Sequence, residues 1–199
     1  MSESNKIEYL KNSIISERDP KYKDAIISIE LNNITDNDLL FLINLYNQLK
    51  DIFLRNSLLK KMYEVKNSIL KDFFLKTYKK ERYLDMKIYA IRGLAQYIDE
   101  KEIEPLMNSF LKSLIKSSQT TPYNYQEYES LKGANALPYL IKKYNYSCFK
   151  KVFDQLEIQY NNMPDAFKGH FTFDENGTLI QLRTTEISQK MISDFFNNR

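Results

Sequence analysis

The chain contains very few of the residues that build metal sites and nucleophilic centres. Of its 199 residues, one is cysteine, one is histidine and none is tryptophan. A single cysteine excludes an intramolecular disulfide, and Cys148 with His170 provides too few ligands for zinc. We therefore expect no bound metal and no other cofactor, and the sequence offers no catalytic residue.

Glycine and proline are also scarce, at four and five residues. Few glycines mean few tight turns and few loops that could cradle phosphate, which favours long helices over sheets. The Gly-rich nucleotide-binding patterns, the zinc-protease pattern H-E-x-x-H and the nucleophile pattern G-x-S-x-G are all missing. These absences argue against most catalytic chemistry, and we expect a binding protein rather than an enzyme.

Long hydrophobic runs and a strong charge of one sign are missing too. No apolar run approaches the roughly 18 residues that a membrane-spanning helix needs, and the first ten residues hold no apolar segment of a secretion signal. We therefore expect a cytoplasmic protein with no membrane partner. Since 29 Lys and Arg nearly balance 26 Asp and Glu, the case for a nucleic-acid partner is weaker than the case for a protein partner.

Amphipathic helices dominate what is present. In residues 84–98 and 103–114, apolar residues recur at spacings of three and four, as they do along one face of a helix. Similar stripes cover most of the chain as far as residue 161. The sequence thus predicts a mostly all-α fold built from stacked pairs of helices.

Local signals set the expected helix boundaries. Asp19, Thr35 and Asp51 each resemble a helix N-cap, and Thr35 forms a capping-box pattern with the aspartate three positions later. Pro138 lies inside a pattern over 127–144 and should kink or split that helix. Further helices are expected at 4–16, 66–80, 84–98, 102–116 and 147–161.

The pattern changes near the C-terminus. Residues 171–182 alternate apolar and polar side chains around Asn176-Gly177, which is a strong hairpin signal and predicts strands at 171–174 and 178–182. A last helix should follow, capped by Thr184 or Thr185. We expect one domain over residues 1–199, with a helical-repeat body at 1–162 and the hairpin and last helix, 163–199, packed on it.

One short phrase recurs along the helical part. It begins as Leu54-Arg55, returns as Met86-Lys87 about one helical-pair repeat later, and returns more loosely as Leu131-Lys132. An aliphatic residue followed by arginine or lysine, with small or aliphatic residues a turn later, resembles the second helix of a HEAT-type repeat. The resemblance covers about residues 36–144.

The resemblance to HEAT-like proteins implies an α-α superhelix whose second helices line a concave face. Proteins of that family mostly bind other proteins, while the HEAT-like alkylpurine DNA glycosylases bind DNA on that face. This chain has no tryptophan, and no residue matches the catalytic aspartate of the glycosylases. Small helical proteins of this appearance also resemble bacterial immunity proteins that neutralise a toxin.

The candidate binding residues follow from this reading. Side chains of the expected second helices would lie beside the core stripes and face a partner, unless they are ordinary solvated charges. Three tyrosines that lead into the third copy offer stiff contact area with a polar tip, unless that segment folds back over the core. The candidates are Arg55, Lys87, Tyr89, Arg92, Tyr123, Tyr125, Tyr128 and Lys132.

The leading function is binding of a protein, with a nucleic-acid backbone as the alternative partner. Arg55, Arg92 and Lys132 should share one exposed face, so that reversing the charge of the two arginines leaves stability nearly unchanged. Cys148 is expected to be a buried, inert thiol, and His170 a partly exposed residue that leads into the hairpin.

Overall fold

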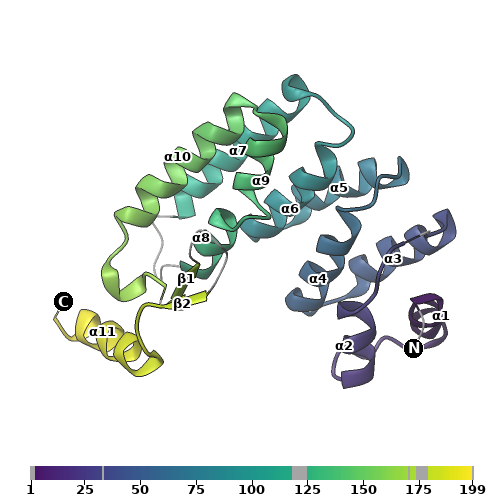
Figure 1. Cartoon of the computed structure of the whole chain (residues 1–199), viewed down its shortest axis with the longest axis horizontal. Coiled ribbons are helices and arrows are strands. Elements are labelled where there is room, and N and C mark those ends of the chain that lie inside the picture. The colour runs from purple at the N-terminus through teal and green to yellow at the C-terminus, as the bar shows by residue number, and fades with distance from the viewer. Residues whose placement is uncertain (1–2, 33, 118–124, 170, 174–178, 199) are drawn as a thin grey trace. The chain divides into compact units, whose positions relative to one another are not determined.

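The chain is predominantly α-helical, as the amphipathic patterns predict (Figure 1). The structure is a computed structural model that describes residues 3–32, 34–117, 125–169, 171–173 and 179–198. In these ranges, one two-stranded antiparallel sheet and one short 3-10 helix are the regular elements that are not α-helices. The expected all-α class with a small C-terminal hairpin is confirmed.

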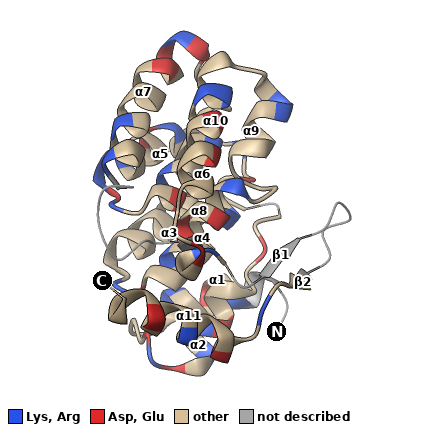
Figure 2. Ribbon diagram, turned by 90° about the vertical axis from the view of Figure 1, so that its left-hand side faces the viewer, with Lys and Arg blue, Asp and Glu red and all other residues tan. Residues whose placement is uncertain are grey.

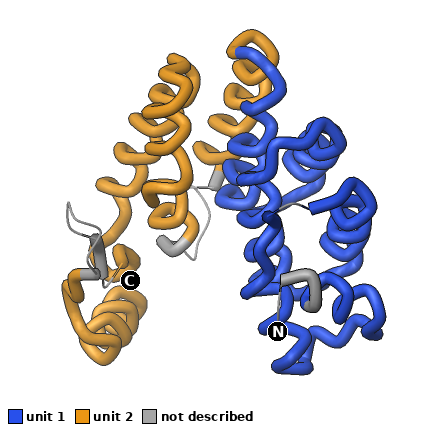
Figure 3. Tube along the Cα trace, turned by 45° about the vertical axis from the view of Figure 1, so that its right-hand side comes forward, with its two compact units in different colours: residues 1–99 blue, residues 100–199 orange. Residues whose placement is uncertain are grey.

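The helices form two compact units, residues 1–99 and residues 100–199 (Figure 3). This boundary lies far before residue 162, where the sequence suggested that the helical body ends. The prediction of one domain over the whole chain stays a prediction.

Unit 1 is built from three successive helix pairs. The second helices of the pairs contact one another in succession, α2 with α4 and α4 with α6, while α3 contacts α5. The pairs therefore stack in two layers, with α4 and α6 next to each other in one layer. The elements are α1 (Glu3–Asn12), α2 (Pro20–Ile27), α3 (Asp36–Gln48), α4 (Ile52–Met62), α5 (Ile69–Lys80) and α6 (Leu84–Leu94).

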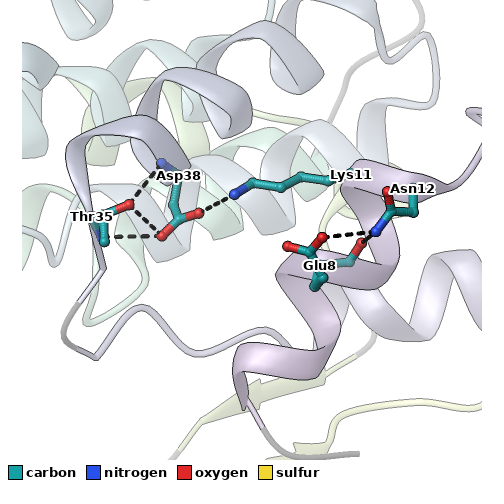
Figure 4. A network of polar contacts seen from close by, with 5 residues as sticks. All are labelled: Glu8, Lys11, Asn12, Thr35 and Asp38. Atoms are coloured by element: carbon teal, nitrogen blue, oxygen red, sulfur yellow. Dashed lines mark hydrogen bonds and ion pairs between the residues drawn. The ribbon is translucent and has the colours of Figure 1, made fainter.

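The predicted caps of unit 1 are present. Asp19 accepts a hydrogen bond from the amide of Lys21, and Asp51 accepts bonds from two amides in the first turn of α4. Thr35 and Asp38 form the reciprocal capping box at the start of α3 (Figure 4). Each cap satisfies amides that the helix leaves without partners and contributes about 1 kcal/mol.

Lys11 ties the first pair of helices to the second. Its Nζ lies 2.6 Å from Oδ1 of Asp38, the same carboxylate that closes the capping box (Figure 4). This contact lowers the pKa of the Asp38 carboxyl, because the ammonium and the Thr35 hydroxyl both stabilise the ionised form. One aspartate thus caps α3 and holds α1 against it.

Helix α6 is the most deeply buried helix of unit 1. It packs against both α4 and α5, and every residue from Ile88 to Leu94 is buried. Gly93 permits the close approach to α5, because a Cβ built on it would lie 2.4 Å from Cζ of the fully buried Phe74. The glycine is therefore required by packing rather than by a turn.

Helix α6 ends at Leu94 instead of continuing to residue 98. The Tyr97 hydroxyl accepts a hydrogen bond from the Asn67 amide at 2.9 Å and lies within bonding distance of the carbonyls of Val65 and Asn67. Gln96 donates to the carbonyl of Tyr63. These bonds to the α4–α5 connection hold residues 95–98 in a turn. The spacing of apolar residues in the sequence does not predict such bonds.

Unit 2 is organised around α10, which contacts α7, α8 and α9. The helix expected at 127–144 is split, and Pro138 lies in the first turn of α9, where its missing amide costs nothing. The elements are α7 (Glu100–Ser117), α8 (Tyr125–Lys132), α9 (Leu137–Tyr144), α10 (Ser147–Asn161), the 3-10 helix η1 (Asp165–Phe167), β1 (Phe171–Phe173), β2 (Leu179–Gln181) and α11 (Thr185–Asn197).

The predicted hairpin is present as a short antiparallel pair in which Phe171 faces Gln181 and Phe173 faces Leu179. Its expected Asn176-Gly177 turn lies outside the described residues. Arg183 follows β2, and its Nη1 donates to the carbonyl of Asp165 at 2.8 Å while its Nε donates to the Ser188 hydroxyl at 3.0 Å. A single guanidinium thus joins η1 to α11.

Candidate functional site

The charged residues predicted on α4 and α6 are engaged within unit 1. Arg55 Nη2 donates to Glu81 Oε2 at 3.0 Å, so this half-buried arginine already has a counter-ion. Lys87 Nζ donates to the carbonyl of Tyr78 at 2.6 Å, in the last turn of α5, and lies 4.6 Å from the centroid of the Tyr78 ring. Burial lowers the pKa of Lys87. Both cations stabilise neighbouring elements of unit 1.

Arg92 and Tyr89 lie in the interior, contrary to the expectation that both face a partner. Only 5% of Arg92 is exposed; it forms an ion pair with Glu64, and its guanidinium lies 4.0 Å from the centroid of the Tyr63 ring. Tyr89 is buried beneath the ammonium of Lys60. The reason is the position of α6, which is covered by two helices rather than one.

The remaining candidates belong to unit 2. Lys132 is half-buried, with its Nζ 4.1 Å from the centroid of the Tyr160 ring. Only 2% of Tyr128 is exposed, so it packs in the core instead of leading into a binding face. Tyr125 starts α8, and Tyr123 lies outside the described residues. The predicted exposed face of Arg55, Arg92 and Lys132 is wrong for Arg92, which is buried. A face common to Arg55 and Lys132 would need both units and stays a prediction.

The burial of Arg92 changes the expected effect of mutating it. We expect Arg92→Ala to lower the free energy of unfolding by about 1 to 2 kcal/mol, because it removes a buried cation–π contact and a charge-assisted hydrogen bond. The effect is limited because Glu64 is exposed and becomes hydrated. Chemical denaturation measures it, with Lys71→Ala on the exposed face of α5 as the control. If the Arg92 variant is as stable as the control, the Arg92 side chain is exposed, as the sequence analysis expected.

The described part of unit 1 contains a groove that could hold a ligand. It has a volume of about 800 Å³ and is lined by α3, α5, the start of α4 and the α5–α6 connection. Elements 30 residues apart in sequence thus contribute to one surface, because α3 packs beside α5.

The floor of the groove is a fixed polar network. The Tyr46 hydroxyl donates to Glu81 Oε1 at 2.7 Å, and Arg55 holds the other oxygen of the same carboxylate. The Tyr46 ring packs edge-on against Phe73 with centroids 5.2 Å apart. Burial and the Glu81 carboxylate raise the pKa of the Tyr46 hydroxyl, so it stays protonated at neutral pH.

The rim of the groove carries cations that the fold does not use. Lys50, Lys76, Lys80 and Arg82 line it, and their side chains form no ion pair or hydrogen bond with the described part of the chain. Asp72 is the one carboxylate on the rim. Charges of both signs occur along the ribbon (Figure 2), whereas the rim of the groove carries more positive than negative side chains.

Apolar side chains accompany these cations. Leu40 from α3, Ile52 from α4 and Tyr83 before α6 line the groove, and all three are exposed, Ile52 by 41%. Exposed apolar groups in a concave site are available for burial by a ligand. The groove therefore offers both charge and apolar contact area.

No family model, curated protein or solved structure matches this chain. The site must accordingly be judged on its own chemistry. In the described ranges, no three His, Cys, Asp or Glu side chains are grouped so that they could hold a metal ion. None of the described helices is long and apolar enough to cross a bilayer.

Sequence reasoning missed this groove. Lys79 and Lys80 are adjacent and look alike in the sequence, yet only Lys80 lines the site. Glu81 gave no signal, since a glutamate after a lysine-rich helix end is ordinary surface in most sequences. The groove cations could have been found only by knowing that α3 and α5 are neighbours.

The single thiol has the environment that the sequence predicts. Cys148 is buried at the start of α10, and burial together with the Glu100 carboxylate raises the pKa of the thiol to about 11. At pH 8 the thiolate fraction is then roughly two hundredfold below that of free cysteine. We expect Ellman's reagent to label Cys148 slowly in the native protein and at once in denaturant. Fast native labelling would show that the thiol is accessible.

His170, which was expected to lead into the hairpin, lies outside the described residues.

Proposed function

We propose that this chain is a non-enzymatic, HEAT-like helical-repeat protein that binds a macromolecular partner, and that the partner is a protein. The two-layer stack of helix pairs in unit 1 fits an α-solenoid, a class whose stacked repeats present extended binding surfaces. The observation that carries the proposal is the groove of unit 1, where unpaired cations lie beside exposed apolar side chains.

The apolar part of the groove favours protein over nucleic acid. A site that follows a phosphate backbone depends mainly on Lys and Arg, and sequence-independent binders add aromatic platforms for stacked bases. Here the apolar lining includes aliphatic Leu40 and Ile52, which can pack against the side chains of a protein. A nucleic-acid-backbone binder remains the alternative, supported by the four unpaired cations of the rim.

A protein that neutralises a toxin is one concrete form of this proposal. Immunity proteins act by tight association and need no catalytic group of their own. The partner of such a protein should arrest growth when it is produced alone, and co-production of this chain should restore growth.

Purification of the tagged full chain from the cells that naturally produce it tests the partner class. We expect one protein to co-purify in near-stoichiometric amount and to remain bound after treatment with DNase and RNase. Native mass spectrometry should give the mass of a defined complex. Release of the bound material by nuclease would favour the nucleic-acid alternative, and the absence of any bound macromolecule would contradict the proposal.

A further inference from the structure

We propose that the groove of unit 1 docks an acidic segment of the protein partner, and that this segment places aliphatic side chains among the lysines of the rim. The inference rests on the proposed function and adds the surface and the chemistry of what binds there.

The charge of the groove selects an acidic ligand. The floor is internally compensated because Arg55 and Glu81 neutralise each other. The rim then holds four cations against one carboxylate, a net charge of +3. Charges left unpaired in a concave site focus the local potential and attract a ligand of opposite sign.

The spacing of two lysines suits carboxylates on neighbouring positions of a segment. Lys76 and Lys80 lie one turn apart on the same face of α5, and like charges in this relation destabilise a helix by about 0.2 to 0.5 kcal/mol. Asp72 lies one turn before Lys76 on the same helix and offsets part of this repulsion in the free groove. A carboxylate bound between the two ammonium groups would offset more of it.

The apolar lining of the groove indicates that the ligand also carries apolar side chains. Leu40, Ile52 and Tyr83 present exposed apolar surface inside the groove, and covering such surface stabilises a complex by about 25 cal/mol per Å². A volume of about 800 Å³ accommodates a few side chains rather than a whole domain. An acidic segment with interspersed leucine-like residues satisfies both the charge and the apolar surface.

The floor keeps the site preorganised. Tyr46 is fixed by its hydrogen bond to Glu81 and by its edge-on contact with Phe73. A ligand thus meets a formed surface and does not have to order it, which reduces the entropic cost of binding.

Three fluorescein-labelled peptides of equal length and a labelled DNA duplex test the proposal by fluorescence anisotropy with the full chain. The first peptide carries Glu and Leu in an amphipathic helical pattern, the second replaces Glu with Lys, and the third replaces Leu with Ser. We expect the Glu–Leu peptide to bind most tightly, the Glu–Ser peptide to bind more weakly, and the Lys–Leu peptide not to bind.

Paired variants on the same helix then locate the site. Lys76→Glu with Lys80→Glu should weaken binding of the Glu–Leu peptide by roughly tenfold or more, whereas Lys71→Glu with Lys79→Glu should change it by less than about twofold. All four lysines are exposed on α5, and only Lys76 and Lys80 line the groove. Circular dichroism should show the same helix content for both double variants.

A second pair tests the apolar contact. Ile52→Ser should weaken binding of the Glu–Leu peptide severalfold, and Phe53→Ser should leave it unchanged, because the neighbouring Phe53 is 64% exposed yet lies outside the groove. Equal effects of the two lysine pairs, equal affinity for the Lys–Leu peptide, or no binding of the Glu–Leu peptide would overturn the inference. Tighter binding of the DNA duplex that is lost in Lys76→Glu with Lys80→Glu would overturn it in favour of nucleic acid.

The native partner separates failure of this inference from failure of the proposed function. A co-purifying protein whose affinity is unchanged by Lys76→Glu with Lys80→Glu would show that the chain binds protein through another surface. Both proposals would be supported if the protein no longer binds the double variant at Lys76 and Lys80 but still binds the double variant at Lys71 and Lys79.

Discussion

Replacing Glu81 with alanine is expected to lower the free energy of unfolding by about 3 kcal/mol, because one buried carboxylate serves two partners. It accepts a hydrogen bond from the Tyr46 hydroxyl at 2.7 Å and pairs with Arg55 at 3.0 Å. The variant removes the carboxylate to which the Tyr46 hydroxyl donates and the counter-ion of the Arg55 guanidinium. Removing one member of such a network costs more than the network contributes as a whole.

Urea denaturation measures this loss, and Glu157→Ala on the exposed face of α10 is the control. Glu157 forms no hydrogen bond or ion pair with the described residues, so its replacement should change stability by less than about 0.5 kcal/mol. If Glu81→Ala is no less stable than the control, the floor of the groove does not hold the rim in place. The double variant with Tyr46→Phe should lose less than the sum of the two single losses, because the two groups share one bond.

Replacing Gly93 with alanine is expected to destabilise the chain by about 3 kcal/mol, near the upper end of what over-packing costs. The added Cβ would lie 2.4 to 2.5 Å from three atoms of the fully buried Phe74 ring, so the ring or one of the two helices would have to shift. The better helix propensity of alanine offsets only about 1 kcal/mol of the strain. Thermal unfolding monitored by circular dichroism should show the loss as a lower melting temperature.

A double-mutant cycle separates this clash from other effects of alanine. Phe74→Leu alone should destabilise by leaving a cavity, yet in the Gly93→Ala background it should be less harmful, because the smaller side chain makes room for the methyl group. Strictly additive losses would mean that α5 and α6 are farther apart than the structure has them.

Boundaries set by short-range chemistry could be read from the sequence. The cap at Asp51, the capping box of Thr35 with Asp38 and the break before Pro138 each depend on residues within one helical turn. The alternation around 171–182 also predicted the hairpin, of which the structure describes β1 and β2. Local hydrogen bonds and backbone sterics decide these features, so local sequence contains them.

Burial of the predicted binding residues could not be read in the same way. The spacing of apolar residues in α6 places Arg92 beside the apolar stripe, where cations are usually exposed. Such a spacing indicates a helix with one buried face, whereas α6 is covered by both α4 and α5. Tyr89 and Arg92 were therefore assigned to the surface, and the structure buries both.

The groove depends on information of longer range still. Lys50 lies between α3 and α4, and Lys80 ends α5. The packing of α3 against α5 brings the two lysines to one site. Each lysine taken alone is an ordinary solvated charge. Their unpaired state is visible only when all described neighbours are known.

Site-specific photo-crosslinking in the cell can show whether an acidic protein segment docks in the groove. Asn44, which lines the groove and is not one of its cations, is replaced by p-benzoylphenylalanine in the full chain, which is then irradiated inside the cells that naturally produce it. The same substitution at Asn37, which is exposed on the same helix and lies outside the groove, is the control. We expect one crosslinked protein from position 44 and none from position 37, with the crosslinked peptide rich in Asp and Glu. A crosslink to nucleic acid, equal crosslinking from both positions, or none from position 44 would contradict the proposed docking site.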